Sequence, residues 1–328
     1  MSGPLLSVQG LKTWLRSPQG VVRAVDGVDF ELHAGKTLGI VGESGSGKSV
    51  LARSLMGLNP SAIEIREAGH VWFEGRDLRT LDEARMRPLR GRRIAMVFQD
   101  PMTCLNPVIP VGEQIARPLM LHLGLTRKAA HARALELLAS VGIPVSGTRT
   151  TRYPHQLSGG QRQRVMIALA LSCDPDILIA DEPTTALDVT VQRQVLDLLM
   201  QAQQARSMAM LLITHNLGVV SDVADDIAVM YAGSFVEKGP ARSVLDNPRM
   251  RYTQALLECA PSLDTPVRGL LPSIPGRPPP LTALPEGCRF APRCRFADAQ
   301  CGQRPPLAGG VHSYACWHPV AAKETDHG

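Results

Sequence analysis

The chain has 328 residues, of which 44% are hydrophobic and 20% charged, values typical of ordinary globular domains. This composition excludes a fully disordered chain, a collagen and a small disulfide-stapled protein. Lysine and arginine (35) exceed aspartate and glutamate (30), which gives a net charge of +5, too small to indicate a nucleic-acid partner by itself. At about 150 residues per domain, the length predicts two domains, or one large domain with an appendage.

No part of the sequence predicts a membrane span or a secretion signal. The longest uncharged stretch in the hydrophobic middle, residues 207–221, is interrupted by polar residues and is shorter than the roughly 20 apolar residues that a span needs. The N-terminus has no basic segment followed by an apolar one, so we expect a cytosolic chain. In that compartment the seven cysteines should be reduced or bound to metal.

The first forty residues have the pattern of short strands. Residues 21–25 and 28–32 alternate apolar and polar side chains around Asp26-Gly27, a pair typical of a hairpin turn. The apolar run 37–41 is the pattern of a buried strand. It leads into a glycine-rich loop and then into helical spacing, so strand, loop and helix follow one another.

The middle of the chain, from about 100 to 160, has apolar residues at helical spacing over 113–123 and 128–141. We expect a mostly helical subdomain inserted between two strand-rich portions. After it, strand and helix patterns alternate, which predicts an α/β fold with a largely parallel sheet. The expected helices are 161–172 and 191–206, and the expected strands are 176–180, 208–214 and 227–231.

The last part of the chain changes in composition. Residues 261–285 contain eight prolines in 25 positions, which predicts a stiff connector without regular structure. Residues 286–328 form a cysteine-rich C-terminal extension that is short of aliphatic runs and contains four of the seven cysteines. We expect something other than apolar packing to hold this extension together.

The glycine-rich loop, residues 42–49, matches the pattern G-x-x-x-x-G-K-[ST] between an expected strand and an expected helix. Glycines allow backbone N–H groups to converge on phosphate oxygens, and the helix N-terminus adds its positive end. Lys48 would neutralise the β- and γ-phosphates, and the Ser49 hydroxyl would bind Mg²⁺. The loop therefore predicts a nucleotide site and disfavours a mere flexible turn.

Two acidic residues end the expected strand 177–181. Asp181 is placed to bind Mg²⁺ at the carboxyl end of that strand. Glu182 follows directly and could act as the general base that polarises the attacking water. Two acids at a strand end are costly to pack unless a cation or a proton offsets their charge.

The segment 153–164 contains the sequence LSGGQ at 157–161, and with it the chain resembles the ATPases of ABC transporters. Ser158 and the glycines after it would begin a helix and give a second anion-binding N-terminus. The resemblance implies a P-loop NTPase core over residues 1–260, with an N-terminal antiparallel β subdomain and the inserted helical subdomain. It also implies that two such subunits hold ATP head to tail, each supplying LSGGQ to the other's phosphate loop.

The same resemblance implies roles for further residues. Gln99 would contact Mg²⁺ and the attacking water, Asp188 would belong to the D-loop, and His215 would contact the γ-phosphate. Trp14 stands where an aromatic residue stacks on adenine, and Asn216 stands where aspartate is frequent. The implied catalytic residues are Lys48, Gln99, Glu182 and His215, and the implied Mg²⁺ ligands are Ser49, Gln99 and Asp181. The implied ATP contacts are Trp14, Gly42, Glu43, Ser44, Gly45, Ser46, Gly47, Lys48, Ser49 and Val50, with Ser158, Gly159, Gly160 and Gln161 from the opposite subunit.

Within that family, the chain resembles the ATPase subunits of dipeptide, oligopeptide and nickel importers. The likeness rests on residues 99–107, 180–190 and 248–257 and on the cysteine-rich end. It implies an enzyme that hydrolyses ATP and works with a second, different ATPase chain, two membrane permeases and an extracytoplasmic binding protein. It also implies a peripheral place on the cytoplasmic face of the membrane.

Four cysteines of the extension, Cys288, Cys294, Cys301 and Cys316, are separated by 5, 6 and 14 residues. This spacing matches neither the ferredoxin run nor the paired cysteines of structural zinc sites, and it leaves a metal site and free thiols open. The peptide-importer resemblance implies a [4Fe–4S] cluster at these four residues. Zinc, with His312 and His318 as extra ligands, and free thiols stay as alternatives, and the unligated cysteines would be Cys104, Cys173 and Cys259.

Two other functions compete with transport. A nucleic-acid- or ribosome-associated ABC-type ATPase is disfavoured, because roughly 110 residues of ordinary helical pattern separate Ser49 from Ser158. DNA-repair members would carry a long coiled coil there, and translation factors would carry two cassettes per chain. A redox-sensing regulator is disfavoured because the full set of catalytic residues is present.

Overall fold

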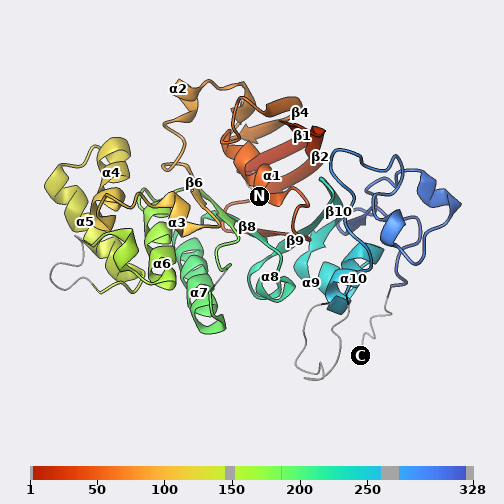
Figure 1. Ribbon diagram of the computed structural model, residues 1–328. Helices are drawn as coiled ribbons and strands as arrows, with labels where there is room; N and C mark the ends of the chain where they lie inside the picture. Colours follow the sequence, from red (N-terminus) through yellow and green to blue (C-terminus); the bar gives the residue numbers. More distant parts are fainter. Residues whose placement is uncertain (1–2, 145–151, 186, 260–272, 323–328) are drawn as a thin grey trace. The chain divides into compact units, whose positions relative to one another are not determined.

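The computed structural model describes residues 3–144, 152–185, 187–259 and 273–322. These residues form two compact units, each assembled from separate stretches of sequence (Figure 1). Unit 1 contains Met1–Leu5, Leu32–Lys36 and Asp77–Ile213, and unit 2 contains Leu6–Glu31, Thr37–Arg76 and Thr214–Gly328. The first twelve residues of the expected connector 261–285 lie outside the described residues.

Unit 2 contains the first strands of the chain as a four-stranded sheet of order β2-β1-β4-β5. Its central pair, β1 and β4, is antiparallel. The expected hairpin at Asp26-Gly27 is wrong: one strand runs through both residues, and Gly27 has a positive φ of 80°. A glycine with positive φ inside a strand is typical of a bulge, and the turn-like pair does not end the strand. The strands are β1 Leu6–Ser17, β2 Gly20–Leu32, β4 Glu64–Phe73 and β5 Arg76–Asp77.

A second group of strands in unit 2 carries the phosphate loop. The wholly buried β3 lies parallel to β9, and β10 is antiparallel to β9 and to the short β11. Continuous apolar runs such as β3 are typical of strands covered on both faces. These strands are β3 Thr37–Val41, β9 Asp226–Tyr231, β10 Ser234–Pro240 and β11 Ser313–Tyr314. The helices of this unit are α1 Lys48–Met56, α8 Leu217–Val223, α9 Ala241–Asp246 and α10 Arg251–Cys259.

Unit 1 contains three parallel strands, with β7 between β6 and β8, as the alternating pattern predicted. The strands are β6 Ile94–Val97, β7 Ile177–Asp181 and β8 Ala209–Thr214. The long helices are α4 Val111–Leu123, α5 Arg127–Ser140, α6 Gly159–Ala170 and α7 Val189–Arg206. The short ones are η1 Leu78–Thr80, α2 Glu83–Met86, α3 Pro101–Cys104 and η3 Pro154–Gln156.

In the stretch where we expect a helical subdomain, α4 and α5 pack together with the following helix α6 around a common apolar core (Figure 1). Ile115, Leu119 and Leu138 are fully buried in it. Local signals define the helix ends: Gly124, with φ 67°, terminates α4, and the Thr126 hydroxyl accepts a hydrogen bond from the Ala129 N–H at the start of α5. The part of this subdomain at 145–151 lies outside the described residues.

The C-terminal extension is part of unit 2, and its described residues have little regular structure. It contains η4 Ala291–Arg293, η5 Ala299–Gly302 and β11. Phe290 is buried against Tyr231 and Tyr252, with ring centroids 5.5 Å and 5.3 Å away. Apolar packing thus contributes more to holding the extension than its composition predicted, because the partners are aromatic residues of β9 and α10.

A buried ion pair also fixes the extension. The Arg289 guanidinium pairs with the Asp26 carboxylate of β2, and it donates to the Ala232 carbonyl and, at 2.7 Å, to the Ser234 hydroxyl. Burial raises the pKa of Asp26, but the hydrogen bond and charge of Arg289 outweigh this effect, and the net pKa is lowered. The pair therefore stays charged although both residues are buried.

Replacing Arg289 by methionine should lower the free energy of unfolding by about 3 kcal/mol, because it leaves the Asp26 charge buried without its main partner. Chemical denaturation measures this change. The double variant Asp26→Asn/Arg289→Met should recover part of the loss, since the stranded charge is gone. Equal stability of the single variant and the original chain would contradict a structural role for the pair.

Candidate functional site

The phosphate loop connects β3 to α1, and its glycines are required by the backbone. Gly42 has φ 154° and Gly47 has φ 107°, and a Cβ on either would lie 2.1 Å or 2.0 Å from a backbone carbonyl oxygen, that of Met230 or Ala24. No other residue fits such contacts. The N-terminus of α1 is therefore left open by Gly47, which has no side chain to cap it.

Lys48 lies inside the loop with only 4% of its surface exposed. Its ammonium donates to the carbonyl oxygens of Gly42 at 2.8 Å and Glu43 at 3.0 Å, and to the Ser46 hydroxyl at 3.4 Å. These contacts satisfy the buried charge of the ammonium. An incoming phosphate would offer the ammonium a charged acceptor in place of neutral ones.

Two other expected nucleotide contacts of unit 2 have distinct surroundings. Trp14 lies on β1, half-buried, with the Arg23 guanidinium over its ring at 5.0 Å from the centroid. His215 is exposed directly after β8. The Asn216 side chain accepts from the Gly218 and Val219 N–H groups and caps α8. Aspartate would make the same cap, so asparagine at this position is compatible with the same local structure.

The ends of β6 and β7 bring together the residues expected to act on the water. The Gln99 side-chain amide donates to Glu182 Oε2 at 3.1 Å, and the Thr185 hydroxyl donates to the same oxygen at 2.8 Å. Asp181, the last residue of β7, is 2% exposed. The structure thus places Gln99 beside Glu182, although 83 residues separate them in sequence, and Thr185 is a partner that sequence reasoning missed.

Glu182 has an unusual backbone. Its φ is 48°, in the left-handed region that non-glycine residues rarely adopt. Its N–H donates to the Ile213 carbonyl of β8 at 2.8 Å, which holds the residue in register with the sheet. Strained residues of this kind concentrate at functional sites, where surrounding structure over-determines them.

The LSGGQ segment begins α6 with a reciprocal cap. The Ser158 hydroxyl accepts from the Gln161 N–H at 3.3 Å, and the Gln161 side chain accepts from the Ser158 N–H at 3.1 Å. A Cβ at Gly159 would meet nothing within 4 Å, whereas one at Gly160 would lie 2.8 Å from Val191. Gly159 therefore leaves an exposed helix N-terminus accessible from outside, and Gly160 allows α6 to approach α7.

The expected D-loop residue Asp188 has a local role. Its carboxylate accepts from the Val191 N–H at 2.9 Å and caps the long helix α7. Ala186, in the same motif, lies outside the described residues. A carboxylate at a helix N-terminus is favoured by both the orphan N–H groups and the helix dipole.

Comparison with known proteins gives two family matches. Residues 25–185 match the model of the ABC transporter family, and residues 236–301 match that of the oligopeptide/dipeptide transporter C-terminal region. A protein of Brucella melitensis biotype 1, described as a candidate peptide import ATP-binding protein, is 48% identical over 97% of this chain and 99% of its own length. A protein of Brucella abortus strain 2308 with the same description is 51% identical over 93% of this chain and 92% of its own length.

The chain belongs to the ABC transporter ATP-binding proteins.

Solved structures agree with this membership. A dimeric ATP-binding cassette bound to ADP and Pi is 26% identical, covers 72% of this chain and 99% of its own length, and superposes with a TM-score of 0.64. A component of an ABC transporter complex from Clostridium perfringens is 25% identical, covers 75% of this chain and 92% of its own length, and gives a TM-score of 0.62. The chain is thus an ABC-type ATPase with the cassette fold, and none of these matches supports the nucleic-acid alternative.

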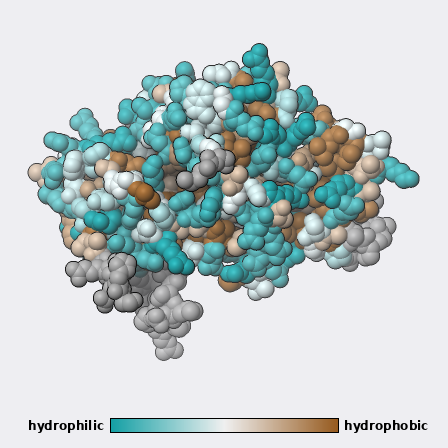
Figure 2. All heavy atoms as spheres, turned by 180° about the vertical axis from the view of Figure 1, so that it is seen from behind, coloured by the Kyte–Doolittle hydropathy of each residue, from teal (hydrophilic) through white to brown (hydrophobic). Residues whose placement is uncertain are grey.

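The surface of this ABC ATPase is mostly polar on the face shown in Figure 2, where hydrophilic side chains predominate. Among the residues that the structure describes, none of the helices has the length and apolar character that crossing a bilayer requires.

The four cysteines of the extension lie near one another. Cys288 and Cys301 are buried, Cys294 and Cys316 are partly buried, and all four belong to one apolar cluster. Burial raises the pKa of the Cys288 and Cys294 thiols, and electrostatic interaction with Cys301 and Cys316 adds to the rise in each case. The Phe296 N–H donates to Cys294 Sγ at 3.4 Å, the kind of contact that stabilises a thiolate.

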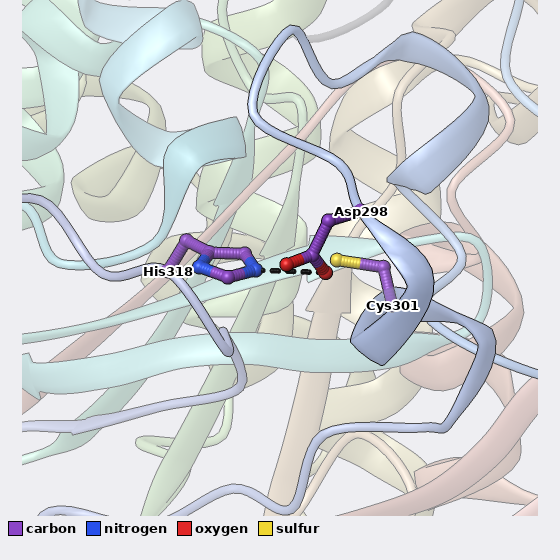
Figure 3. Close-up of side chains that lie close together, drawn as sticks. All are labelled: Asp298, Cys301 and His318. Carbon is purple, nitrogen blue, oxygen red and sulfur yellow. Dashed lines mark ion pairs between the residues drawn. The ribbon is translucent and has the colours of Figure 1, made fainter.

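A second possible ligand set overlaps with the first. Asp298, Cys301 and His318 offer ligand atoms that all lie within 4.8 Å of one another, and Figure 3 shows their side chains converging. His318 Nε2 lies 3.0 Å from the Asp298 carboxylate, and the closeness of His318 lowers the pKa of Asp298. In contrast, His312 pairs with the buried Glu237 at 2.7 Å, so this expected extra zinc ligand is engaged elsewhere.

Sequence reasoning missed the residues that connect the extension to the phosphate loop. Arg293, beside Cys294, makes a two-bond ion pair with Glu43, and the Tyr252 hydroxyl accepts from the Glu43 N–H. The only available signal was that arginine follows or precedes two of the four cysteines. Nothing in the local pattern indicated a partner 250 residues away.

Proposed function

We propose that this chain is the ATP-hydrolysing subunit of an importer for dipeptides, oligopeptides or related substrates, attached peripherally to the cytoplasmic face of the membrane. The observation that carries the proposal is the match of residues 236–301 to the oligopeptide/dipeptide transporter C-terminal region, combined with nearly full-length similarity to candidate peptide import ATP-binding proteins. The partners would be a second, different ATPase chain, two membrane permeases and an extracytoplasmic binding protein.

We infer that the phosphate loop holds the triphosphate of ATP. Lys48 supports this role, since its ammonium lies among loop carbonyls that a phosphate oxygen would replace as acceptors. The adenine would stack on the Trp14 face that Arg23 does not cover. The remaining contacts, residues 42–47, Ser49 and Val50, would come from the loop backbone and the first turn of α1.

The oxygen donors of Ser49, Gln99 and Asp181 suit Mg²⁺, which prefers hydroxyl, amide and carboxylate oxygens. When bound, Mg²⁺ would supply positive charge to the phosphate oxygens. Glu182 would take a proton from the attacking water, with Gln99 and Thr185 orienting its carboxylate. Lys48 and His215 would stabilise the charge that develops on the γ-phosphate.

The accessible N-terminus of α6 would contact the ATP that a second subunit binds. The open space at Gly159 and the reciprocal Ser158–Gln161 cap support this role, because they leave the first helical N–H groups oriented outward. The partner's α6 would then complete this chain's nucleotide site. Asp188, at the start of α7, would lie in the D-loop of the same interface.

We also propose that Cys288, Cys294, Cys301 and Cys316 hold a [4Fe–4S] cluster, which takes four thiolates. The proposal is supported by the shared apolar surroundings of the four cysteines and by the burial of Cys288 and Cys301. A cluster is larger than a single ion, so its ligands need not converge as closely as those of zinc. When bound, the cluster would cross-link a segment that has little regular structure.

The transport function can be tested by uptake of a labelled tripeptide in cells that lack this chain. Restoring the original chain should restore uptake, whereas Lys48→Met should leave uptake at background because nucleotide binding is lost. Lys128→Met, which changes an exposed lysine on α5, is the matched control and should behave as the original. Undiminished tripeptide uptake in the cells that lack the chain would contradict the proposed cargo.

A further inference from the structure

Glu43 is the second residue of the phosphate loop, and two residues from the C-terminal half of unit 2 form hydrogen bonds with it. The Arg293 guanidinium donates to both carboxylate oxygens of Glu43, at 2.6 Å and 2.9 Å. The Tyr252 hydroxyl accepts a hydrogen bond from the Glu43 N–H at 2.9 Å. One residue of the loop is therefore fixed through its side chain by the extension and through its backbone by α10.

Arg293 is itself held rigidly. Its side chain is 3% exposed, and its other N–H groups donate to the carbonyls of Pro275 at 2.9 Å and Ile274 at 3.3 Å and to the Tyr231 hydroxyl at 3.3 Å. All of the donors that a guanidinium offers are thus used. A planar, two-bond arginine–carboxylate pair fixes orientation as well as charge.

Tyr252 is equally constrained. It is fully buried, and its ring lies 4.4 Å from that of Tyr231 and 5.3 Å from that of Phe290 of the extension. Burial raises the pKa of its hydroxyl, so the group stays uncharged, and its oxygen accepts from the Glu43 N–H. The aromatic cluster therefore sets the position of the loop backbone at Glu43.

The far side of the same loop segment faces Lys48, whose ammonium donates to the Gly42 and Glu43 carbonyls. Tyr252 thus contacts the Gly42–Glu43 peptide group, whose carbonyl accepts from the catalytic lysine. Arg293 holds the side chain of the same residue, Glu43. A carboxylate in this loop would also repel the strongly negative triphosphate unless a cation offset it. Arg293 supplies that cation.

We propose that Arg293 and Tyr252 are positioning residues of the nucleotide site, through which the cysteine-rich extension sets the shape and charge of the phosphate loop. The inference rests on the proposed role of that loop in binding ATP. Without Arg293, the Glu43 charge is unbalanced beside the phosphates and the loop loses its outer support. Because coupling is reciprocal, nucleotide in the loop must also stabilise the extension.

The test measures the dissociation constant of a fluorescent ATP analogue for the full-length chain. Arg293→Met should raise this constant about tenfold, within the usual range of coupling between sites. Adding Glu43→Gln should restore affinity in part, because the unbalanced carboxylate is removed. A contact that served only stability would give no such recovery.

Two further variants separate positioning from folding. Tyr252→Phe keeps the packed ring and removes only the hydroxyl, and it should raise the dissociation constant about threefold without touching the cysteines. Arg295→Met, which changes an exposed neighbour in the extension, should leave the dissociation constant unchanged. If both Arg293→Met and Tyr252→Phe fold and bind the analogue as the original chain does, the inference is wrong.

Hydrogen exchange gives a second readout. Nucleotide should slow exchange of the amides in residues 288–296 of the original chain, and this protection should be lost in Arg293→Met. Lys48→Met distinguishes a failure of the proposed nucleotide site from a failure of the proposed coupling to the extension. If Lys48→Met binds the analogue normally, the loop is not the nucleotide site. If it loses binding while Arg293→Met and Tyr252→Phe are unaffected, only the coupling to the extension fails.

Discussion

Replacing Glu182 by glutamine should reduce ATP turnover about 1000-fold while leaving ATP binding intact, since a general base contributes on the order of 10² to 10⁴ in rate. The amide occupies the same space and can still bond to Gln99 and Thr185. It cannot accept the proton of the attacking water at neutral pH. The measurements are the steady-state release of phosphate and the binding of radiolabelled ATP.

The matched control for this variant is Glu136→Gln, which changes an exposed glutamate on α5. Its turnover should equal that of the original chain. The turnover of Thr185→Val should lie between those of Glu182→Gln and Glu136→Gln, because Glu182 keeps its charge and loses one of its orienting hydrogen bonds. Undiminished hydrolysis by Glu182→Gln would remove this residue as the base.

The second large effect concerns metal content. Purified without oxygen, the chain should contain about four irons, and Cys288→Ser or Cys301→Ser should lose nearly all of them. Both thiols are buried, so a serine hydroxyl cannot replace the thiolate as a ligand without moving the segment. Iron and zinc are measured by elemental analysis, together with the visible absorption of the protein.

Controls separate the cluster from its alternatives. Cys104→Ser should keep the iron, since this cysteine is exposed on α3, outside the extension. His318→Gln distinguishes the two ligand sets, because a cluster on four thiolates does not need His318, whereas zinc at Asp298, Cys301 and His318 does. Zinc in place of iron, lost in His318→Gln, would overturn the cluster, and a metal-free chain would favour free thiols.

Local sequence was enough to predict those features whose causes are local. The phosphate loop, the strand before it and the capped start of α6 are encoded within a few residues. Their glycines allow close backbone contacts, and the Ser158 side chain caps the helix. The hairpin predicted at Asp26-Gly27 is wrong because that prediction used local sequence alone. The sequence of this pair suits a turn, but the continuous strand and the buried Arg289 partner depend on residues far along the chain.

Features that need distant partners were visible only in the structure. Gln99 and Glu182 meet because parallel strands end at one edge of a sheet. The strand pattern predicted parallel strands, but it did not predict which residues at their ends lie side by side. The contact of Arg293 with Glu43 spans 250 positions and depends on how the extension folds within unit 2. No periodicity or spacing predicts where the side chains of the extension lie, because its described residues have almost no regular secondary structure.

The central proposal is that ATP is held between two cassettes, one phosphate loop facing the other chain's α6. Sedimentation of Glu182→Gln mixed with the proposed companion ATPase subunit tests this directly. With ATP and Mg²⁺ the mixture should sediment as a dimer, and it should separate when nucleotide is removed or when Ser158→Arg obstructs the start of α6. A mixture that remains monomeric with saturating ATP would contradict the account.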